Sequence, residues 1–204
     1  MNEKQHEIII GTLLGDTWID DKCLRIKQSD EHKDYVFWLY SQLSDLCKSP
    51  PKQRSDYKQW YFQTKFLKEI SDYKKLFYRN KKKILPENIK SLLTSPLSLA
   101  VWYMDDGSLD FRPKDHYNFS FCTNAFSVKE NCLLRDALKE NFGIECSIQT
   151  PLCRGKRYPE IYIGAKGRDK FLNLISPHVL KCFSNRLPPY TLTPQRLNPL
   201  IGTR

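Results

Sequence analysis

The chain has 204 residues, of which 40% are hydrophobic and 27% are charged, and its formal net charge is +10. This composition excludes a disordered tail, because such a segment has too few apolar residues to build a core. The basic excess is spread over the whole chain and favours a polyanionic partner such as nucleic acid. No apolar run approaches the roughly 20 residues that a membrane span needs, so we expect no membrane contact.

The cysteine content argues against two kinds of structural site. The seven cysteines are odd in number and form no C-x-x-C pair, so neither a disulfide framework nor a zinc ribbon is expected. The opening residues also lack the basic and apolar segments of a signal peptide. We expect an intracellular protein that acts where its gene is expressed, in an organelle, the cytoplasm or the nucleoid.

In the first half of the chain, hydrophobic spacing predicts helices and strands in turn. A helix over residues 2–16 begins at Asn2 and is followed by a strand over 22–28. A second helix over 35–47 ends before Pro50 and Pro51, which cannot continue it. A strand over 59–65 and a helix over 66–77 complete this half.

The second half begins with a helix that has Ser95 as its N-cap and ends at Gly107. Strands are predicted over 117–124, 144–150 and 158–164, and helices over 131–141 and 169–183. The extra residues of this half are expected in loops near 110–116 and 152–157. Residues 86–95 are predicted to link the two halves.

An internal repeat relates the two halves. KFLKEIS at 65–71 matches KFLNLIS at 170–176 at five of seven positions, and a basic residue shortly precedes Leu-Pro in each half, at Lys83 and Arg186. Asp16 aligns with Asp106 at the end of the first helix of each half. The chain therefore divides into an N-terminal half, residues 1–96, and a C-terminal half, residues 97–204. Each half has the pattern αββαββα or a shortened form of it.

Asp16 and Asp106 both stand at the end of a helix, where the partial negative charge of the helix disfavours a carboxylate. A nearby cation would remove this conflict. If the two helices pack side by side through small residues, their carboxylates meet at a pseudo-twofold axis and offer hard oxygen ligands to Mg²⁺. In a basic protein, such a centre favours phosphodiester hydrolysis.

Two segments carry a family resemblance, IIGTLLGDT at 9–17 and LAVWYMDDG at 99–107. They resemble the paired motifs of the LAGLIDADG homing endonucleases, and the chain resembles the single-chain members that have both motifs. The resemblance implies an α+β fold in which two pseudo-symmetric αββαββα halves pack through their motif helices. It also implies that the antiparallel sheets form a saddle for double-stranded DNA and that the protein is a monomer.

The resemblance also implies roles for residues at matching positions, with Mg²⁺ as the cofactor and Mn²⁺ as a substitute. The implied metal ligands are the carboxylates of Asp16 and Asp106 and the backbone carbonyls of Gly15 and Asp105. Lys83 and Arg186 are implied as catalytic basic residues near the cleavage centre. Arginine replaces the usual lysine at Arg186 and stays charged, so we expect the two DNA strands to be cut at unequal rates.

Alternation along the strands predicts which side chains face DNA. Apolar residues such as Leu24 and Ile26 should face the helices, so their polar neighbours face outward. The residues predicted to contact DNA are Arg25, Lys27, Tyr61, Gln63, Lys65, Ser120, Ser147, Gln149 and Arg157. The alternative is that they form the solvated polar face of an antiparallel sheet, and a slip of one residue would reverse every assignment.

The leading hypothesis is a site-specific endonuclease that makes a metal-dependent double-strand break in a long asymmetric DNA target and serves intron homing. One alternative is an RNA-binding intron maturase, with or without nuclease activity, whose partner is intron RNA. Another is a DNA-binding regulator that binds without turnover. The paired carboxylates of Asp16 and Asp106 favour the nuclease, because binding alone does not need them.

Overall fold

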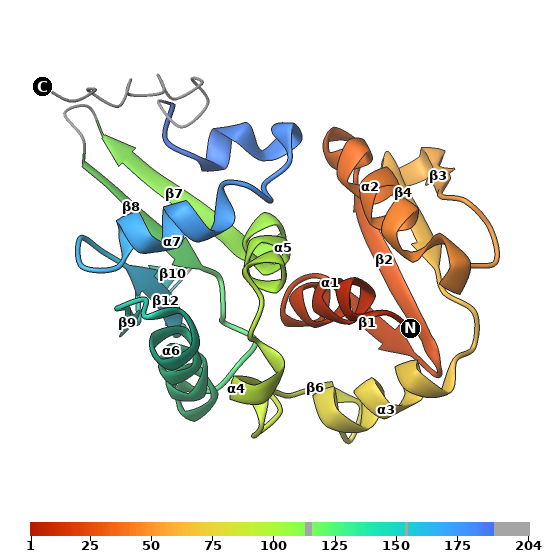
Figure 1. Cartoon of the computed structure of the whole chain (residues 1–204), viewed down its shortest axis with the longest axis horizontal. Helices are drawn as coiled ribbons and strands as arrows, with labels where there is room; N and C mark the ends of the chain where they lie inside the picture. Colours follow the sequence, from red (N-terminus) through yellow and green to blue (C-terminus); the bar gives the residue numbers. More distant parts are fainter. Residues whose placement is uncertain (113–115, 154, 190–204) are drawn as a thin grey trace, which may run out of the picture.

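Two helices form the centre of the molecule, α1 (Glu3–Leu14) and α5 (Pro96–Asp106), and they lie side by side (Figure 1). The structure is a computed structural model and describes residues 1–112, 116–153 and 155–189. The side chain of Asn2 caps α1 by accepting from the backbone N–H of Gln5, and Ser95 caps α5 in the same way through Leu97. Both motif helices therefore begin where the sequence signals predict.

The motif helices α1 and α5 approach closely because small residues face each other. A Cβ atom at Gly11 would lie 2.6 Å from the carbonyl oxygen of Ser98 and 2.7 Å from Cβ of Val101, so a larger residue would push the helices apart. The Ser98 hydroxyl donates a hydrogen bond to the carbonyl of Glu7 at 2.8 Å. Every residue over 8–14 and 97–104 is buried.

In the N-terminal half, α1 is followed by an antiparallel sheet of order β1-β2-β4-β3. Its strands are β1 (Trp18–Asp20), β2 (Cys23–Ser29), β3 (Lys52–Arg54) and β4 (Gln59–Gln63). Helix α2 (Lys33–Leu43) joins β2 to β3, with the 3-10 turns η1 (Asp30–His32) before it and η2 (Ser44–Leu46) after it. The 3-10 turn η3 (Ser55–Tyr57) joins β3 to β4. The half continues through α3 (Lys68–Phe77), the paired strands β5 (Tyr78–Arg79) and β6 (Lys82–Lys83), and α4 (Ile89–Leu92).

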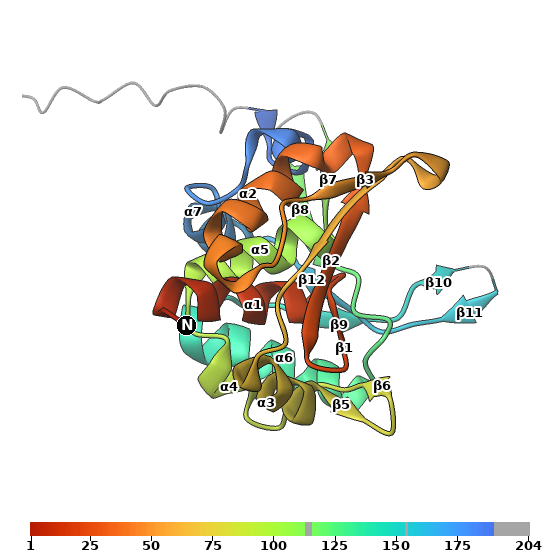
Figure 2. The ribbon, with the colours of Figure 1, turned by 90° about the vertical axis from the view of Figure 1, so that its right-hand side faces the viewer.

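In the C-terminal half, α5 is followed by an antiparallel sheet of order β7-β8-β12-β9. Its strands are β7 (Gly107–Arg112), β8 (His116–Phe121), β9 (Ser147–Gln149) and β12 (Glu160–Ile163). Helix α6 (Val128–Phe142) joins β8 to β9, and α7 (Arg168–Ile175) and the 3-10 segment η4 (Lys181–Arg186) follow β12. A hairpin of β10 (Leu152–Cys153) and β11 (Lys156–Arg157) extends away from this sheet (Figure 2).

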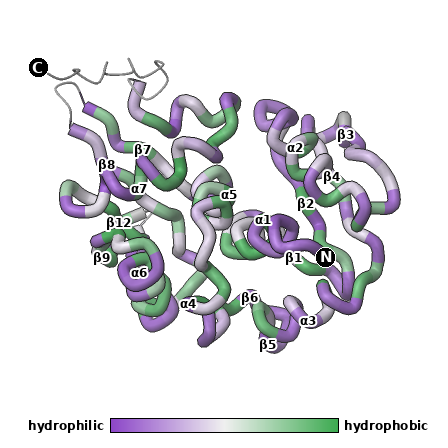
Figure 3. The backbone as a smooth tube through the Cα atoms, in the orientation of Figure 1, coloured by the Kyte–Doolittle hydropathy of each residue, from purple (hydrophilic) through white to green (hydrophobic). Residues whose placement is uncertain are grey.

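Each sheet turns its apolar side chains towards the helices. Leu24 and Ile26 on β2 are buried, as are Ile161 and Ile163 on β12. In the C-terminal half the core is rich in aromatic rings, and Phe121 stacks on Trp102 of α5 with ring centroids 3.9 Å apart. Aromatic pairs of this kind add about 0.5–1.5 kcal/mol each beyond the burial of their area. In Figure 3 the tube of α6 changes between purple and green, as expected for a helix with one polar and one apolar side.

The predicted α+β fold of two αββαββα halves is confirmed, and strands β1, β3, β5, β6, β7, β10 and β11 are additional to those predicted from the sequence. Strand β3 escapes prediction because all three of its residues are exposed, so it has no apolar alternation. The predicted domain boundary at residue 96 coincides with the first residue of α5. Residues 190–204 of the predicted C-terminal half lie outside the described residues.

Two expectations about the C-terminal half are wrong. The predicted helix over 169–183 ends at Ile175, because Pro177 cannot donate the next helical hydrogen bond, and η4 is a separate segment. The predicted loop over 152–157 is the hairpin β10–β11, whose turn is eased by Gly155 with φ of +77°. The predicted linker over 86–95 contains α4.

The predicted loop over 110–116 is also largely strand. Residues 110–112 belong to β7 and residue 116 begins β8, while 113–115 lie outside the described residues. Within the part of the chain that the structure describes, no helix is both long enough and apolar enough to cross a membrane.

Candidate active site

The ends of the two motif helices bring three carboxyl groups together. Asp16 follows the end of α1 and is exposed, whereas Asp105 and Asp106 are the last residues of α5. Burial, followed by the charge of Asp16, raises the pKa of Asp106 to about 7. Asp16 therefore lies close enough to Asp106 for its charge to disfavour ionisation of Asp106.

The carboxyl group of Asp105 lies between the two helix ends. It accepts a hydrogen bond from the backbone N–H of Asp16 at 3.3 Å. A Cβ atom at Gly15 would lie 2.4 Å from Cβ of Asp105, so glycine at this position leaves the space that the aspartate fills. Burial raises the pKa of Asp105 well above its usual range, and the charges of Asp16 and Asp106 add to the effect.

Gln28 joins the carboxyl groups and was not among the predicted site residues. Its Nε2 donates hydrogen bonds to Asp16 Oδ2 at 3.1 Å and to Asp105 Oδ1 at 3.2 Å. The residue lies near the end of β2, on the same side of the strand as the buried Leu24 and Ile26. A long polar side chain on an otherwise apolar strand face is the sequence signal that could have identified it.

Lys83 reaches the end of α1 from β6. Its Nζ donates hydrogen bonds to the carbonyl oxygens of Gly15 at 2.6 Å and Thr17 at 3.0 Å. These carbonyls belong to a helix C-terminus, whose partial negative charge an ammonium group offsets. Burial lowers the pKa of Lys83, while the charges of the nearby aspartates act to raise it.

Arg186 takes the corresponding place at the end of α5. Its Nη1 donates to the carbonyl oxygens of Met104 at 2.8 Å, Tyr103 at 3.0 Å and Asp105 at 3.4 Å. The hydroxyl of Tyr103 donates in return to the carbonyl of Arg186 at 2.8 Å. Both predicted basic residues thus lie at the ends of the motif helices. There they bind the Gly15 and Asp105 carbonyls that the sequence resemblance offers as metal ligands.

Four of the predicted DNA-contacting residues lie together on the N-terminal sheet: Arg25, Lys27, Tyr61 and Gln63. They occupy its outward face, which is the face opposite the buried apolar residues of β2 and β4. The strand register sets Arg25 opposite Gln63 and Lys27 opposite Tyr61. Arg25 also forms an ion pair with Asp20, its Nη2 lying 2.8 Å from the carboxylate.

The side chain of Lys65, another predicted DNA contact, binds a different part of the molecule. Its Nζ donates to the carbonyl of Asp45 in η2 at 2.9 Å. The carboxylate of Asp45 in turn accepts from Gln5 in the first turn of α1, at 2.7 Å. Because Asp16 follows the opposite end of α1, the ammonium group of Lys65 lies towards the start of α1 and not at the helix ends that carry the aspartates.

The remaining predicted contacts belong to the C-terminal half. Ser120 on β8 and Ser147 and Gln149 on β9 occupy the outward face of the sheet, opposite the buried Ile161. Arg157 lies on β11, beyond the sheet, and its Nη1 donates to the carbonyl of Thr150 at 2.9 Å.

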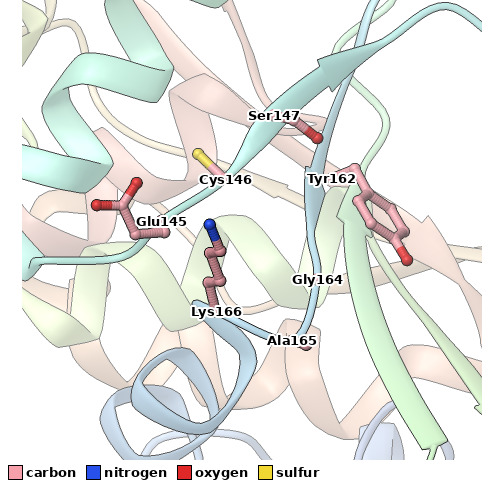
Figure 4. Close-up of a pocket in the computed structure, with 7 residues that line it drawn as sticks. All are labelled: Glu145, Cys146, Ser147, Tyr162, Gly164, Ala165 and Lys166. Atoms are coloured by element: carbon pink, nitrogen blue, oxygen red, sulfur yellow. The ribbon is translucent and has the colours of Figure 1, made fainter.

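A hollow of about 250 Å³ opens beside β9 and β12, and Figure 4 shows its lining. It contains Ser147 but none of the three aspartates at the helix ends. Burial raises the pKa of Cys146 in its lining to about 12, so this thiol stays protonated and is a poor nucleophile. The hollow is separate from the candidate active site.

The amino-acid sequence is similar to proteins of one family. A sequence model of the LAGLIDADG DNA endonuclease family matches residues 6–171. Protein RecA of Mycobacterium gastri is 27% identical over 98% of this chain, which spans about half of that protein's length, 52%. The probable intron-encoded endonuclease 1 of Wickerhamomyces canadensis is 28% identical over 88% of this chain and 82% of its own length.

Solved structures are similar to this one over most of the chain. The homing endonuclease I-WcaI bound to its DNA recognition sequence has a TM-score of 0.78 and 26% identity, covering 92% of this chain and 87% of that chain. I-DmoI in complex with DNA and Mn shares the fold, with a TM-score of 0.52 and 15% identity, covering 84% and 96%. Because the family match at 6–171 includes both helix ends with their aspartates, the chain belongs to the LAGLIDADG DNA endonuclease family.

Proposed function

We propose that the protein is a site-specific endonuclease that breaks both strands of a long, asymmetric DNA target and so serves intron homing. The observation that supports this most strongly is the meeting of Asp16 and Asp106, one from each half, at the ends of two packed helices. The net charge of +10 favours a nucleic-acid substrate. A regulator that only binds DNA would not need two carboxylates, one from each half, at a shared centre.

The donor set at the helix ends fits a divalent cation. Asp16 and Asp106 provide carboxylate oxygens, and burial and the charge of Asp16 raise the pKa of Asp106 although the charges of Lys83 and Arg186 act to lower it. Oxygen ligands of this kind suit Mg²⁺, with Mn²⁺ as a substitute. Among the described residues no group of three or more His, Cys, Asp and Glu side chains is arranged to hold a metal, so backbone carbonyls, water and DNA phosphate would complete the coordination.

Asp16 and Asp106 would hold the metal, with the carbonyls of Gly15 and Asp105 beside them. When bound, a divalent metal at such a site lowers the pKa of water and stabilises the charge on the leaving oxygen. Gln28 holds Asp16 in place through the hydrogen bond at 3.1 Å.

Lys83 and Arg186 would act in two ways at the cleavage centre. In the free protein they neutralise the helix ends, and their remaining donors are available to a DNA phosphate. Lysine can also change its protonation state, whereas arginine stays charged. The strand cut beside Lys83 and the strand cut beside Arg186 would therefore proceed at different rates.

Double-stranded DNA is the proposed partner, and the protein would bind it as a monomer because one chain carries both motifs. The outward faces of the two sheets carry seven of the nine predicted contacts. Arg157 lies on the hairpin beyond the C-terminal sheet, and Lys65 binds η2. I-WcaI, which is similar over 92% of this chain, was solved bound to its DNA recognition sequence. That likeness supports the same class of partner here.

The test is cleavage of duplexes that span candidate insertion sites, with Mg²⁺, by wild type and by Asp16→Asn and Asp106→Asn. Wild type should cut both strands and each variant should lose at least about 100-fold in rate. Asp72→Asn is the matched control, because Asp72 is exposed on α3 and pairs with the neighbouring Lys75 at 2.8 Å. Tight binding without cutting by any protein would instead support a regulator, and binding of intron RNA alone would support a maturase.

A further inference from the structure

The outward faces of the two sheets differ in charge. The N-terminal face carries four basic side chains, from Arg25, Lys27, Lys52 and Arg54. The outward positions nearest the centre of the C-terminal sheet instead carry Ser108, Ser120, Ser147, Gln149 and Glu160. Basic side chains bind phosphate without regard to sequence, whereas hydroxyl, amide and carboxyl groups act through hydrogen bonds to specific partners.

Glu160 is the exceptional residue of the C-terminal face. It begins β12, where Ile161 and Ile163 are fully buried, so Glu160 and Tyr162 lie on the outward side. The register sets Glu160 opposite Gln149 on β9, and its own strand β12 is an inner strand of the sheet rather than an edge strand. A carboxylate here is unexpected for a surface that binds a polyanion.

The carboxylate of Glu160 has no hydrogen-bond or ion-pair partner among the residues that the structure describes. Other acidic residues beside the outward faces do: Asp20 pairs with Arg25 at 2.8 Å and Asp110 with Arg112 at 3.2 Å. Burial alone raises the pKa of Glu160, with no basic group to offset it. The side chain is therefore half-buried, outward-facing and ready to accept a hydrogen bond.

Glu160 lies at the end of its sheet that is nearer the candidate active site. The strand register between β12 and β8 brings Ile161 opposite Phe121, so Glu160 lies opposite the next residue, Cys122. The backbone N–H of Cys122 donates to the carbonyl of Asp106 at 2.9 Å. A base pair reached by Glu160 would therefore be near the cleavage centre, in the half of the target bound by the C-terminal sheet.

We infer that Glu160 is a specificity-determining residue that accepts a hydrogen bond from the N4 amino group of a cytosine in the major groove. A carboxylate is an acceptor only, and the phosphates of a duplex repel it. The donors that a duplex offers in the major groove are the amino groups of cytosine and adenine. Adenine carries the acceptor N7 beside its amino group, which repels a second acceptor, so cytosine fits better. The inference rests on the proposed binding of double-stranded DNA.

The test is selection of bound duplexes from a randomised pool, with Ca²⁺ in place of Mg²⁺, by wild type, Glu160→Gln and Glu160→Ser. Wild type should enrich cytosine at one position of one half-site. Glu160→Gln should reduce that preference about 10-fold to 100-fold, and it should shift towards adenine because an amide suits N6 and N7 together. Glu160→Ser should lose the cytosine preference without this shift.

Glu140→Gln is the matched control for the lost charge, since Glu140 is exposed on α6 and pairs with Lys90. Its profile should equal that of wild type. An unchanged profile in both Glu160 variants would overturn the inference, as would uniformly tighter binding to every sequence, which would mean that the carboxylate only repels phosphate. Failure of wild type to enrich any duplex would overturn the proposed function as well, so the two failures are distinguishable.

Discussion

A lysine binds the end of α1, whereas an arginine binds the end of α5. The difference extends to the neighbouring positions, because Gly15 of the first motif aligns with Asp105 of the second, whose side chain fills the space that glycine leaves. Gln28 reaches the carboxylates from β2, but Thr123, at the matching place after β8, donates instead to Asn131. The two halves share a fold, but they place different side chains at the candidate active site between them.

Pseudo-symmetry of the backbone does not make the site symmetric. Gly15 in the first motif leaves the space that Asp105 in the second motif fills. Substitutions at single positions therefore separate the contributions of the two halves.

Lys83→Met should lower cleavage of one DNA strand by about 100-fold to 1,000-fold, because it removes a charged donor from the cleavage centre. Arg186→Lys should have a smaller effect, since a lysine still offers donors to the end of α5. Duplexes with a different label on each strand would report both rates. Lys81→Met is the control, because Lys81 is exposed in the adjacent turn. Equal loss on both strands would contradict the assignment of Lys83 to one cut.

Gly15→Ala should destabilise the protein by about 1–3 kcal/mol, because the new Cβ atom would lie 2.4 Å from Cβ of Asp105. Asp105→Gly should relieve this clash, so the double variant should be more stable than the sum of the single changes predicts. Urea unfolding of the four proteins in the cycle gives the coupling energy. Simple additivity would mean that the two positions do not compete for the same space.

Asp106→Asn should raise the Tm of the metal-free protein at pH 8 and have little effect near pH 4. The pKa of Asp106 is raised from its ordinary value to about 7, so ionising this group costs stability as the pH rises from about 4 to 7. Asparagine avoids that cost. Thermal unfolding in EDTA across this range measures the difference, and added Mg²⁺ should stabilise wild type but not the variant. A pH-independent difference would show that the buried charge is not its cause.

Lys27→Gln should lower the slope of log K against log salt by about one, because Lys27 lies exposed on the basic outward face of the N-terminal sheet. Ser147→Ala on the C-terminal face should leave the slope unchanged, since a hydroxyl neutralises no phosphate. DNA-binding isotherms at several salt concentrations measure both slopes. A reduced slope for Ser147→Ala would remove the proposed division between the two sheets.

The sequence predicts the parts of this molecule that depend on local pattern. The repeat and the two motif segments predict the paired helices and bring out Asp16 and Asp106, and alternation assigns Arg25 and Lys27 to the outward face. All of these predictions depend on residues within one helix or strand, or on a repeat that is visible in the sequence itself.

Contacts between distant elements could not be predicted in this way. Gln28 has the position of a core residue, and only the closeness of two helix ends shows that it binds carboxylates. Lys65 continues the alternation of β4, but a carbonyl of η2 holds it elsewhere. The contacts of Arg186 depend on η4 folding back to α5, across a break in the predicted last helix. Each case requires the tertiary arrangement.

The hairpin β10–β11 lets the C-terminal half vary in length in a way that the N-terminal half does not share. It enters after Gln149 on β9 and returns before Glu160 on β12, and these two residues stay paired across the sheet. The chain between them can therefore lengthen or shorten without moving the register of either strand or the ends of the motif helices. Proteins with this fold can therefore contact more of a ligand through added hairpins, while the active site at the helix ends stays unchanged.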